Sequence, residues 1–563
     1  MLQLRHFLLA VTILLISQIT FGQQKYTISG YIKDGKTGES LIGATVAVKE
    51  TGDATGSNAY GFYSITLPEG KYTISYQYLG YSTVTKEVDL SSNLKMDVEI
   101  GELKVEQLQE VEINADREAN VKSVEMSVNK LDIRQISKIP ALLGEVDVIR
   151  SIQLLPGVST VGEGASGFNV RGGSIDQNLV LIDEAPVYNS SHLFGFFSVF
   201  NPDAVKDVKL FKGGIPAQYG GRLSSILDVR LKEGNSKRFA GQGGIGSIFS
   251  RLTLEGPIKK NQGSFIVAGR RSYIDVLAAP ALANNEDFKD LALYFYDFTA
   301  KGNYTLGKRD KIFVSSYLGR DVFGVGAFGF NWGNATLSTR WSHVFTDKVF
   351  MNITGFYSNY DYRIGASTGN SGDSFDWRSN IINYSIKPEF SWFLNTKNTI
   401  SFGGQAILFQ FVPGIATFKS SGTQTKRELP DKFGLENALY VSNEQIITPR
   451  FTLTYGLRVS HFEYITKYPQ NVTLTGTADA PQPTTLDTLS KTQFVKSYIN
   501  PEPRVSFKYQ LTDKSSIKGS YMRTAQYIHL ASNTAASIPL DVWTPSTNNI
   551  KPQLADQFAL GYF

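Results

Sequence analysis

Alternation of apolar and polar residues dominates the chain from about Phe239 onwards. In the stretch 450–461 every second residue is apolar: Phe451, Leu453, Tyr455, Leu457 and Val459. The stretch 504–511 has the same period of two, with apolar Val505, Phe507, Tyr509 and Leu511. This period predicts β-strands with one apolar and one polar face. We therefore predict a large antiparallel β domain over residues 237–563.

Short polar turns divide this domain at intervals of about 40 to 65 residues. They occur near Asn261, Lys308, Asp347, Thr396, Thr448 and Asp513. Each interval holds two strands of about ten residues and one longer, variable loop. A soluble sandwich would show the same alternation within each strand. Short turns at one rim and long loops at the other are, however, typical of a transmembrane β-barrel.

Residues 23–103 read as short alternating strands separated by turn signals. The clearest strands are Tyr26–Ile32, Ala44–Val48, Asn58–Ile65 and Pro68–Tyr76. About seven strands in fewer than about 80 residues predict a small β-sandwich. It contains no catalytic constellation, so we expect a passive folding and docking module.

Residues 121–236 predict a compact α+β unit. Helical spacing relates Leu142, Val146, Ile149 and Ile152, and Pro156-Gly157 ends that helix. Four strands follow at Gly167–Gly173, Asn178–Tyr188, Val205–Phe211 and Ile226–Arg230. The string Gly162-x-Gly164-x-x-Gly167 lacks the preceding strand and following helix that dinucleotide binding requires. We expect no nucleotide site.

The N-terminus, residues 1–22, has the features of a secretory signal peptide. Arg5 and His6 precede the apolar run Phe7–Ile16, and small residues end at Gly22. About ten apolar residues are too few to span a bilayer, and no later segment offers about 18. We expect export, cleavage after Gly22, and membrane insertion only as a β-barrel.

Composition narrows the function classes. Of 563 residues, 42% are hydrophobic, 12% aromatic and 19% charged, and the net charge is +5. No basic stripe points to nucleic acid. The chain has no Cys, which excludes disulfides, thiol catalysis and Cys-ligated metals. The five histidines are scattered and form no HExxH motif, so we expect no metal, no cofactor and no catalytic residue.

Several motifs resemble a known family. Four stretches are similar to the plug domain of TonB-dependent outer-membrane receptors: Leu154–Val158, Phe168–Gly173, Leu179–Tyr188 and Lys212–Ser225. Gly43–Val46, Gly61–Ile65 and Leu67–Tyr72 resemble a carboxypeptidase-regulatory-like sandwich. The order of sandwich, plug and barrel resembles receptors of Bacteroidetes-type Gram-negative bacteria. The expected fold class is dominated by β-structure: an N-terminal β-sandwich, an α+β plug and a transmembrane antiparallel β-barrel.

The resemblance implies a function. Such receptors sit in the outer membrane and actively import a scarce ligand, such as an iron chelate or a glycan, through a 22-stranded barrel closed by the plug. The implied partners are the TonB energy-transducing complex, outer-membrane lipid, an unknown transported ligand and, as an option, a surface ligand-binding lipoprotein. The resemblance also implies that the protein is a receptor and not an enzyme.

Two alternative functions stay open. An exported carbohydrate-active enzyme would combine a sandwich with an aromatic-rich β domain, but it needs two carboxylates about 5–10 Å apart. A surface adhesin or signal transducer could use the same barrel. Energy-dependent uptake of a labelled ligand distinguishes import from both alternatives.

The linker 104–120 contains one β-prone patch, Leu108–Ala115. The resemblance puts a TonB box just ahead of the plug, and the candidate residues are Leu108, Gln109, Glu110, Val111, Glu112 and Ile113. An exposed extended segment can add as a strand to a partner's sheet. The alternative is the last strand of the sandwich or a plain linker.

The plug motifs supply further candidate residues. The paired glycines Gly172, Gly173, Gly213, Gly214, Gly220 and Gly221 suit tight turns. Arg171 and Arg222 lie beside them and either pair with barrel carboxylates to hold a removable plug, or are solvated. Asp183 and its neighbour Glu184 form an acidic turn to which we assign no chemistry.

The strand count carries one more expectation. Six short turns join about twelve strands, and another begins near Ala555. The apolar series Phe558, Leu560 and Tyr562 is out of phase with the terminal Phe563. The resemblance implies about nine further strands, or on the order of 200 residues. We therefore expect residues 237–563 to be the N-terminal part of a barrel and to form an incompletely closed sheet.

Overall fold

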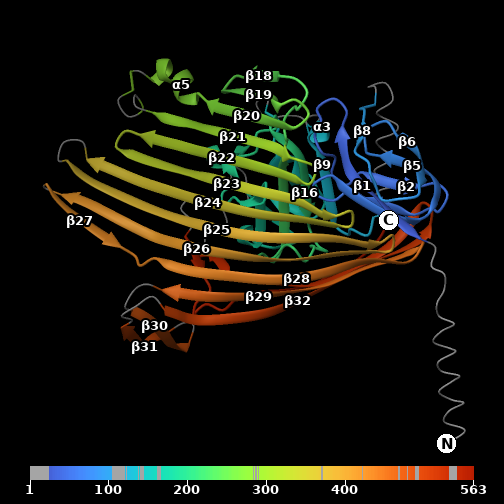
Figure 1. Cartoon of the computed structure of the whole chain (residues 1–563). Helices are drawn as coiled ribbons and strands as arrows, with labels where there is room; N and C mark the ends of the chain where they lie inside the picture. The colour runs from blue at the N-terminus through green and yellow to red at the C-terminus, as the bar shows by residue number, and fades with distance from the viewer. Residues whose placement is uncertain are drawn as a thin grey trace, which may run out of the picture.

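The structure is a computed structural model. It describes residues 24–103, 121, 123–136, 139, 145–160, 167–282, 284–285, 288, 291–368, 372–420, 422–466, 470–477, 480–488, 493–531 and 542–563. Within these ranges no helix has the length and apolar character needed to cross a bilayer. The signal-peptide prediction (residues 1–22) and the TonB-box candidate (Leu108–Ile113) lie outside the described residues. Figure 1 shows a sandwich, a central unit and a large curved sheet.

The N-terminal residues form the expected β-sandwich. One sheet contains β4 (Phe62–Pro68), β1 (Lys25–Asp34), β7 (Leu94–Lys95) and β8 (Val98–Ile100). The other contains β3 (Ala54–Gly56), β2 (Thr45–Val48), β5 (Gly70–Gln77) and β6 (Val84–Leu90). Alternate residues of both sheets face each other and build the core, among them Ile28, Val46, Ile65 and Ile74. Period-two patterning therefore set the faces of these strands correctly.

The plug is a mixed sheet covered by short helices. Its strand order is β13 (Ala185–Pro186), β12 (Asn178–Ile182), β17 (Ser225–Leu231), β16 (Val205–Phe211) and β9 (Val128–Asp132). Strands β12 and β17 are parallel, and the other pairs are antiparallel. Two small ribbons flank it: β10 (Val158–Thr160) with β11 (Phe168–Val170), and β14 (Ser191–His192) with β15 (Phe197–Ser198).

The main plug helix is shorter than its apolar spacing indicated. Helix α4 (Val148–Gln153) begins after Asp147, because the Asp147 side chain accepts a hydrogen bond from the Arg150 amide at 2.9 Å. Val146 precedes the helix, and Leu142 lies outside the described residues. A second helix is α3 (Ile133–Ile136). Both pack on the plug sheet and build a hydrophobic core, to which Ala268 and Tyr317 of the barrel strands also contribute.

The third part is one antiparallel sheet that curves around the plug. Its strands in order are β18 (Ala240–Ile245), β19 (Phe249–Lys259), β20 (Gly263–Ser272), β21 (Ala292–Leu306), β22 (Asp310–Val325), β23 (Phe328–Thr346), β24 (Val349–Thr368), β25 (Asp373–Asn395), β26 (Asn398–Ser420), β28 (Lys432–Thr448), β29 (Phe451–Thr466), β32 (Gln493–Thr512), β33 (Ser515–Gln526) and β36 (Gln553–Tyr562). All six short turns occur between strands where the sequence predicted them.

The longer connections lie at the opposite end of the strands (Figure 1). They carry α5 (Ile274–Leu282), β27 (Thr423–Glu428), the hairpin β30 (Gln470–Thr477) with β31 (Ala480–Thr488), and the hairpin β34 (Ile528–Leu530) with β35 (Trp543–Pro545). The sandwich lies beside the short-turn end.

The sheet is open, as expected. Strands β18 and β36 form its two edges and do not pair with each other in the part of the chain that the structure describes. The strand count corrects the expectation by one. The two strands per turn plus β36 were anticipated, but β18 was not, because its sequence AGQGGI contains three glycines and shows no alternation.

The two faces of the sheet differ as the alternation predicts. In β29, Tyr455, Leu457 and Val459 are exposed on the outside, whereas Arg458 and Ser460 are fully buried on the inside. An exposed apolar exterior with a polar interior suits a strand that faces lipid on one side.

Inward-facing residues change in kind along the strands. Aromatic side chains pack together near the long-loop end, including Phe330, Trp332, Tyr360, Tyr362 and Phe411. Charged side chains occupy the middle, including Lys301, Arg340, Lys387 and Arg458. Near the short turns they become apolar again, with Val344, Phe350 and Phe393. The plug contacts the polar and charged residues in the middle of the strands. The sandwich contacts the apolar residues near the short turns.

Candidate functional site at the plug–barrel interface

The turn between β12 and β13 brings two acidic residues to the barrel wall. Ile182 pairs with Ala185, so Asp183 and Glu184 form a two-residue hairpin turn. Their φ angles are 44° and 76°, the signature of a type I′ turn. Non-glycine residues seldom adopt positive φ, and such strain is retained where the rest of the structure requires it. Both side chains are buried.

Asp183 is held by one cation of the barrel and by the backbone of the plug. Its Oδ2 lies 2.8 Å from Nζ of Lys301 in β21, and its Oδ1 accepts from the Leu231 amide at 3.0 Å. Lys301 also donates to the Leu231 carbonyl at 2.9 Å. Burial alone would raise the pKa of Asp183, but Lys301 and Arg340 lower it below its usual value. Asp183 is therefore an ionised anchor.

Glu184 collects cations from both parts of the structure. Its Oε1 lies 3.1 Å from Nη1 of Arg230 in the plug and 3.4 Å from Nη1 of Arg340 in β23. Its Oε2 lies 3.7 Å from Nζ of Lys387 in β25. Burial opposes ionisation, yet these three positive charges hold the pKa of Glu184 far below its usual range.

A second charged cluster lies further round the barrel. Glu145 of the plug pairs with Nη1 of Arg270 at 2.8 Å and Nη1 of Arg251 at 3.0 Å. Arg270 also contacts Asp297 at 2.6 Å. Here again the plug supplies a carboxylate and the barrel supplies the guanidinium groups.

His192 of the plug is buried between two barrel carboxylates. Its Nδ1 lies 2.7 Å from Asp321 and its Nε2 lies 3.4 Å from Asp297. The ring stacks on Phe295 with centroids 4.4 Å apart. Burial would lower the pKa of His192, but the two aspartates raise it above its usual value.

Barrel arginines also bind the backbone of the plug segment 215–222. Arg504 donates through Nη1 to the Ile215 carbonyl at 3.0 Å, and Arg458 donates to the Ala217 carbonyl at 3.4 Å. Gly220 lies so close to Arg458 that a Cβ there would overlap the guanidinium group. This close approach explains why glycine occupies position 220.

The other glycines of the plug motifs have mixed conformations. Gly172, Gly214 and Gly221 have positive φ, whereas Gly173, Gly213 and Gly220 do not. A paired-glycine motif thus corresponds to one positive-φ position in each pair.

The two candidate arginines are placed differently. Arg171 has a positive φ of 50° and donates to Ser127 Oγ within the plug at 2.6 Å. Arg222 is buried, donates to the Gly221 carbonyl at 2.8 Å and lies over the Trp543 ring at 5.4 Å. Neither forms an ion pair with a barrel carboxylate among the described residues. The ion pairs of Asp183 with Lys301 and of Glu184 with Lys387 have the opposite polarity to the expected pairs. His192 of the plug, in contrast, faces barrel carboxylates.

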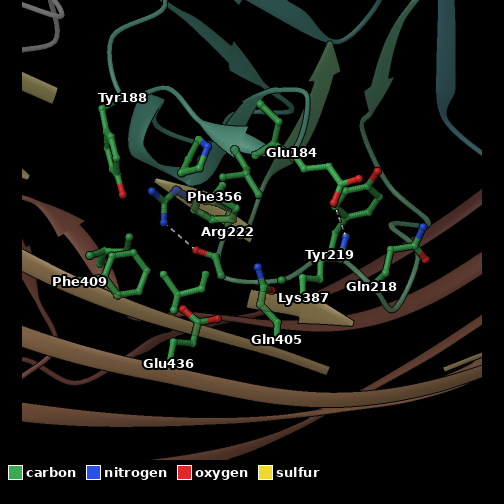
Figure 2. A pocket seen from close by; sticks show the side chains of 17 residues that line it. Glu184, Tyr188, Gln218, Tyr219, Arg222, Phe356, Lys387, Gln405, Phe409 and Glu436 are labelled. Atoms are coloured by element: carbon green, nitrogen blue, oxygen red, sulfur yellow. Dashed lines mark hydrogen bonds and ion pairs between the residues drawn. The ribbon is translucent and has the colours of Figure 1, made fainter. Parts of the chain in front are cut away.

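A cavity of about 60 Å³ separates the plug from the barrel wall at this level. Figure 2 shows Glu184 and Lys387 facing each other on one side, with Arg222 and Glu436 on the other. The lining is mixed, because Leu181 and Phe356 lie among these charged groups. The volume suffices for a few water molecules and leaves the interface incompletely packed.

Sequence reasoning missed the barrel side of this interface. Lys301, Arg340 and Lys387 lie in the middle of β21, β23 and β25, at inward positions of the alternation. A charge in mid-strand is expensive unless it faces the lumen or a buried partner. That signal was available, although it does not say which plug residue each cation meets.

Three domain families match the chain in order. One described as CarboxypepD_reg-like domain matches residues 28–113, one described as TonB-dependent Receptor Plug Domain matches residues 120–225, and one described as Outer membrane beta barrel domain matches residues 390–561. TonB-dependent receptor P3 of Formosa agariphila is 24% identical over 121 residues. That match covers 22% of this chain and only 12% of the receptor's length.

Solved structures share the fold. The copper transporter OprC has a TM-score of 0.56 at 11% identity, over 78% of this chain and 70% of that one. The ferric yersiniabactin uptake receptor FyuA from Yersinia pestis has a TM-score of 0.53 at 12% identity, over 79% and 70%. The ferric citrate transporter FecA has a TM-score of 0.54 at 15% identity, over 78% and 68%. At these identities the likeness concerns the fold alone.

The barrel and plug matches support a location in the outer membrane. The three families match successive parts of the chain, and the plug is surrounded by the curved sheet (Figure 1). The chain therefore belongs to the TonB-dependent receptors, with a carboxypeptidase-regulatory-like domain, a plug domain and an outer membrane β-barrel domain.

Proposed function

We propose that this receptor imports a scarce ligand across the outer membrane and that the TonB complex of the inner membrane supplies the energy by pulling on the plug. The observation that carries this proposal is the character of the plug–barrel interface. Ion pairs such as Lys301–Asp183 and Arg340–Glu184 hold a plug with its own core against the polar lumen. The family membership favours a transporter over an exported carbohydrate-active enzyme.

Interfaces of this kind fix a position without resisting release strongly. A buried ion pair loses much of its Coulomb attraction to the cost of desolvating both charges. When the plug leaves, both partners regain water. The charged groups thus set the register of the plug in the barrel, while most of the hydrophobic core consists of plug residues and moves with the plug.

The energy-coupling element in this proposal is the TonB box at Leu108–Ile113, with Val111 and Ile113 at its centre. Its place in the chain supports the assignment: it follows the Tyr81–Glu102 bridge of the sandwich and precedes the plug match, which begins at residue 120. The CarboxypepD_reg-like match extends to residue 113 and keeps the last strand of the sandwich as the alternative. A strand added by this segment to a TonB sheet would transmit a pull directly to the plug.

The coupling role is tested with Val111→Pro. Proline removes the amide that a strand pairing needs, so uptake should be lost while ligand binding at the cell surface is retained. Val111→Ala keeps the amide and is the matched control, which should retain most of the uptake. Uptake by Val111→Pro at the level of Val111→Ala would refute the box assignment.

Import itself is tested with cells that express the receptor. Radio-iron chelates and fluorescent oligosaccharides cover the two ligand classes that we propose, and a protonophore should abolish uptake of the one that is carried. A surface lipoprotein partner, if present, should co-purify with the receptor. Ligand that binds to the cells but never enters them would favour an adhesin or a signal transducer.

A further inference from the structure

The sandwich closes the same mouth of the barrel that the plug would leave through. It lies beside the short-turn end of the strands (Figure 1), which is the periplasmic end in barrels of this kind. Ser64 donates to the Asp347 carbonyl at 2.6 Å, and Ser29 donates to Asp347 Oδ1 at 3.2 Å. Asp347 belongs to the short turn between β23 and β24. The sandwich is therefore attached to the rim itself.

Aromatic residues of the sandwich enter the lumen. Phe62 stacks on Phe350 with centroids 5.2 Å apart, and Tyr60 stacks on the same ring at 5.6 Å. Phe62 also lies 6.0 Å from Phe393. Together with Val344 these residues form a buried apolar cluster, which we call the rim cluster.

The rim cluster explains an otherwise costly feature of the barrel. Val344, Phe350 and Phe393 point into the lumen at its wet periplasmic mouth, where neighbouring inward positions are polar. Uncovered apolar groups there would lose the hydrophobic free energy of burial, about 1.5–3 kcal/mol for a large side chain. The plug does not cover them; the sandwich does.

Tyr60, a member of the rim cluster, also contacts the ion pairs of Glu184 with Arg230 and Arg340. Its hydroxyl donates to Glu184 Oε1 at 3.1 Å. The Arg340 guanidinium lies over its ring at 4.8 Å, and Arg230 lies at 5.9 Å. Tyr60 thus contacts the plug carboxylate and both arginines that hold it.

The loop that presents Tyr60 is built for this position. The Asn58 side chain accepts from the amides of Tyr60 at 2.9 Å and Phe62 at 3.1 Å. Gly61 has φ of 79°, and a Cβ there would lie 2.7 Å from the Ser40 Cβ. Ser40 in turn accepts at its carbonyl from Lys206 of the plug at 2.6 Å.

We propose that the N-terminal sandwich is a second closure of the channel, which holds the plug through Tyr60 and must undock from the rim before the plug can leave. The proposal rests on the import function proposed above, but its tests measure closure and not import. The candidate TonB box directly follows the sandwich in the chain. A pull on that segment would therefore apply force to both the sandwich and the plug.

The coupling of sandwich and plug is tested with a disulfide. The chain has no cysteine, so Ser29→Cys with Asp347→Cys introduces one pair whose parent side-chain atoms lie 3.2 Å apart. In the purified receptor, oxidation should slow hydrogen exchange of the β12 and β17 amides about tenfold, and reduction should restore it. The single-cysteine variants are the controls. Exchange that is unchanged by oxidation would overturn the proposal.

Closure is tested in cells with vancomycin, an antibiotic too large for porins. The double substitution Tyr60→Ala and Phe62→Ala removes the aromatic contacts and should cause loss of vancomycin exclusion. Tyr60→Phe keeps the ring and should preserve exclusion. Adding the oxidised cysteine pair to the alanine variant should restore exclusion, and a reductant should reverse the rescue.

The vancomycin result is interpreted only for variants present in the outer membrane at the wild-type level. A leak that persists with the oxidised pair, or exclusion that survives the double alanine substitution, would contradict the second closure. Failure to detect import of any chelate or glycan would count against the proposed function alone.

Discussion

At the scale of single residues, the plug is held by charges whose partners are far apart in the chain. Asp183 and Glu184 are neighbours, but their cations come from β17, β21, β23 and β25. Each charge is buried, so each depends on its partner. Removing one partner of a buried pair is more destabilising than removing both, because it leaves an uncompensated charge.

We expect Lys301→Met to weaken plug docking by about 3 kcal/mol, because Asp183 would stay buried without its counter-ion. The measurement is hydrogen exchange of the β12 and β17 amides in the purified receptor. Lys308→Met, at an exposed turn at the periplasmic end of the same strand, is the control and should change nothing. Adding Asp183→Asn to Lys301→Met should recover part of the loss, and no recovery would contradict the pairing.

We expect His192 to make plug docking depend on pH. Its pKa is raised by Asp321 and Asp297, which face it together with the Tyr317 hydroxyl, and Arg270 pairs with Asp297. The stabilisation is fully present below the unfolded value of about 6.5 and is lost as pH rises through the raised pKa. Urea midpoints for plug release should therefore fall across that window. The His192→Gln variant should lack this component, and an identical slope in both proteins would refute it.

At the scale of elements, each barrel strand presents two chemically different faces. In β29 the outer face is apolar and exposed, while Arg458 and Ser460 on the inner face are buried against the plug side. A one-residue shift in register would exchange these faces. The strands therefore have their register set by lipid on one side and by plug contacts on the other.

We expect Leu457→Arg, near the middle of β29, to destabilise insertion by about 2–4 kcal/mol, since a lipid-facing charge is most costly at mid-depth. Ile447→Arg lies near the periplasmic turn and should cost about 0–1 kcal/mol. Folding into vesicles of a neutral lipid, followed by urea titration, measures both. Equal effects of the two substitutions would argue against a lipid-facing exterior for β29.

At the scale of the whole molecule, the three parts are stacked along one channel. The aromatic cluster lies towards the long loops, the charged interface surrounds the plug, and the rim cluster receives the sandwich. The charged level of the lumen contacts the charged groups of the plug, and the apolar level near the short turns contacts the aromatic residues of the sandwich. This correspondence is why we assign closure to the sandwich as well as to the plug.

Export of the whole chain gives a prediction at this scale. If residues 1–22 are a signal peptide, the protein recovered from the outer membrane should begin at Gln23. Mass spectrometry of the N-terminal peptide measures this directly. A mature protein that retains Met1 would contradict cleavage after Gly22.

Much of the fold could be predicted from local pattern. The alternation in 450–461 predicted β29 and its two faces, and the six polar turns predicted how the strands are joined. Strand β18 was not predicted, because the three glycines in its sequence AGQGGI have no side chains to show an alternation of apolar and polar residues. Helix α4 is shorter than its spacing indicated, because the Asp147 cap starts it late.

The charged interface could not be predicted in the same way. Arg171 and Arg222 were expected either to pair with barrel carboxylates or to be solvated. The plug instead presents the carboxylates Asp183, Glu184 and Glu145 to barrel cations. Tyr60 lies within the strand predicted at Asn58–Ile65, whereas the observed strand β4 begins only at Phe62. The role of Tyr60 depends on Phe350 of the barrel and Glu184 of the plug, both of which are far from Tyr60 in the chain.

The sequence by itself determined the period of the strands, the position of the short turns and the order of the three domains. Those properties depend on residues close together in the chain, through hydrogen bonding and through which faces are apolar. Only the tertiary structure decided which charges meet and what covers the rim cluster. Such contacts join distant segments, and they depend on how the curved sheet positions each strand around the plug and the sandwich.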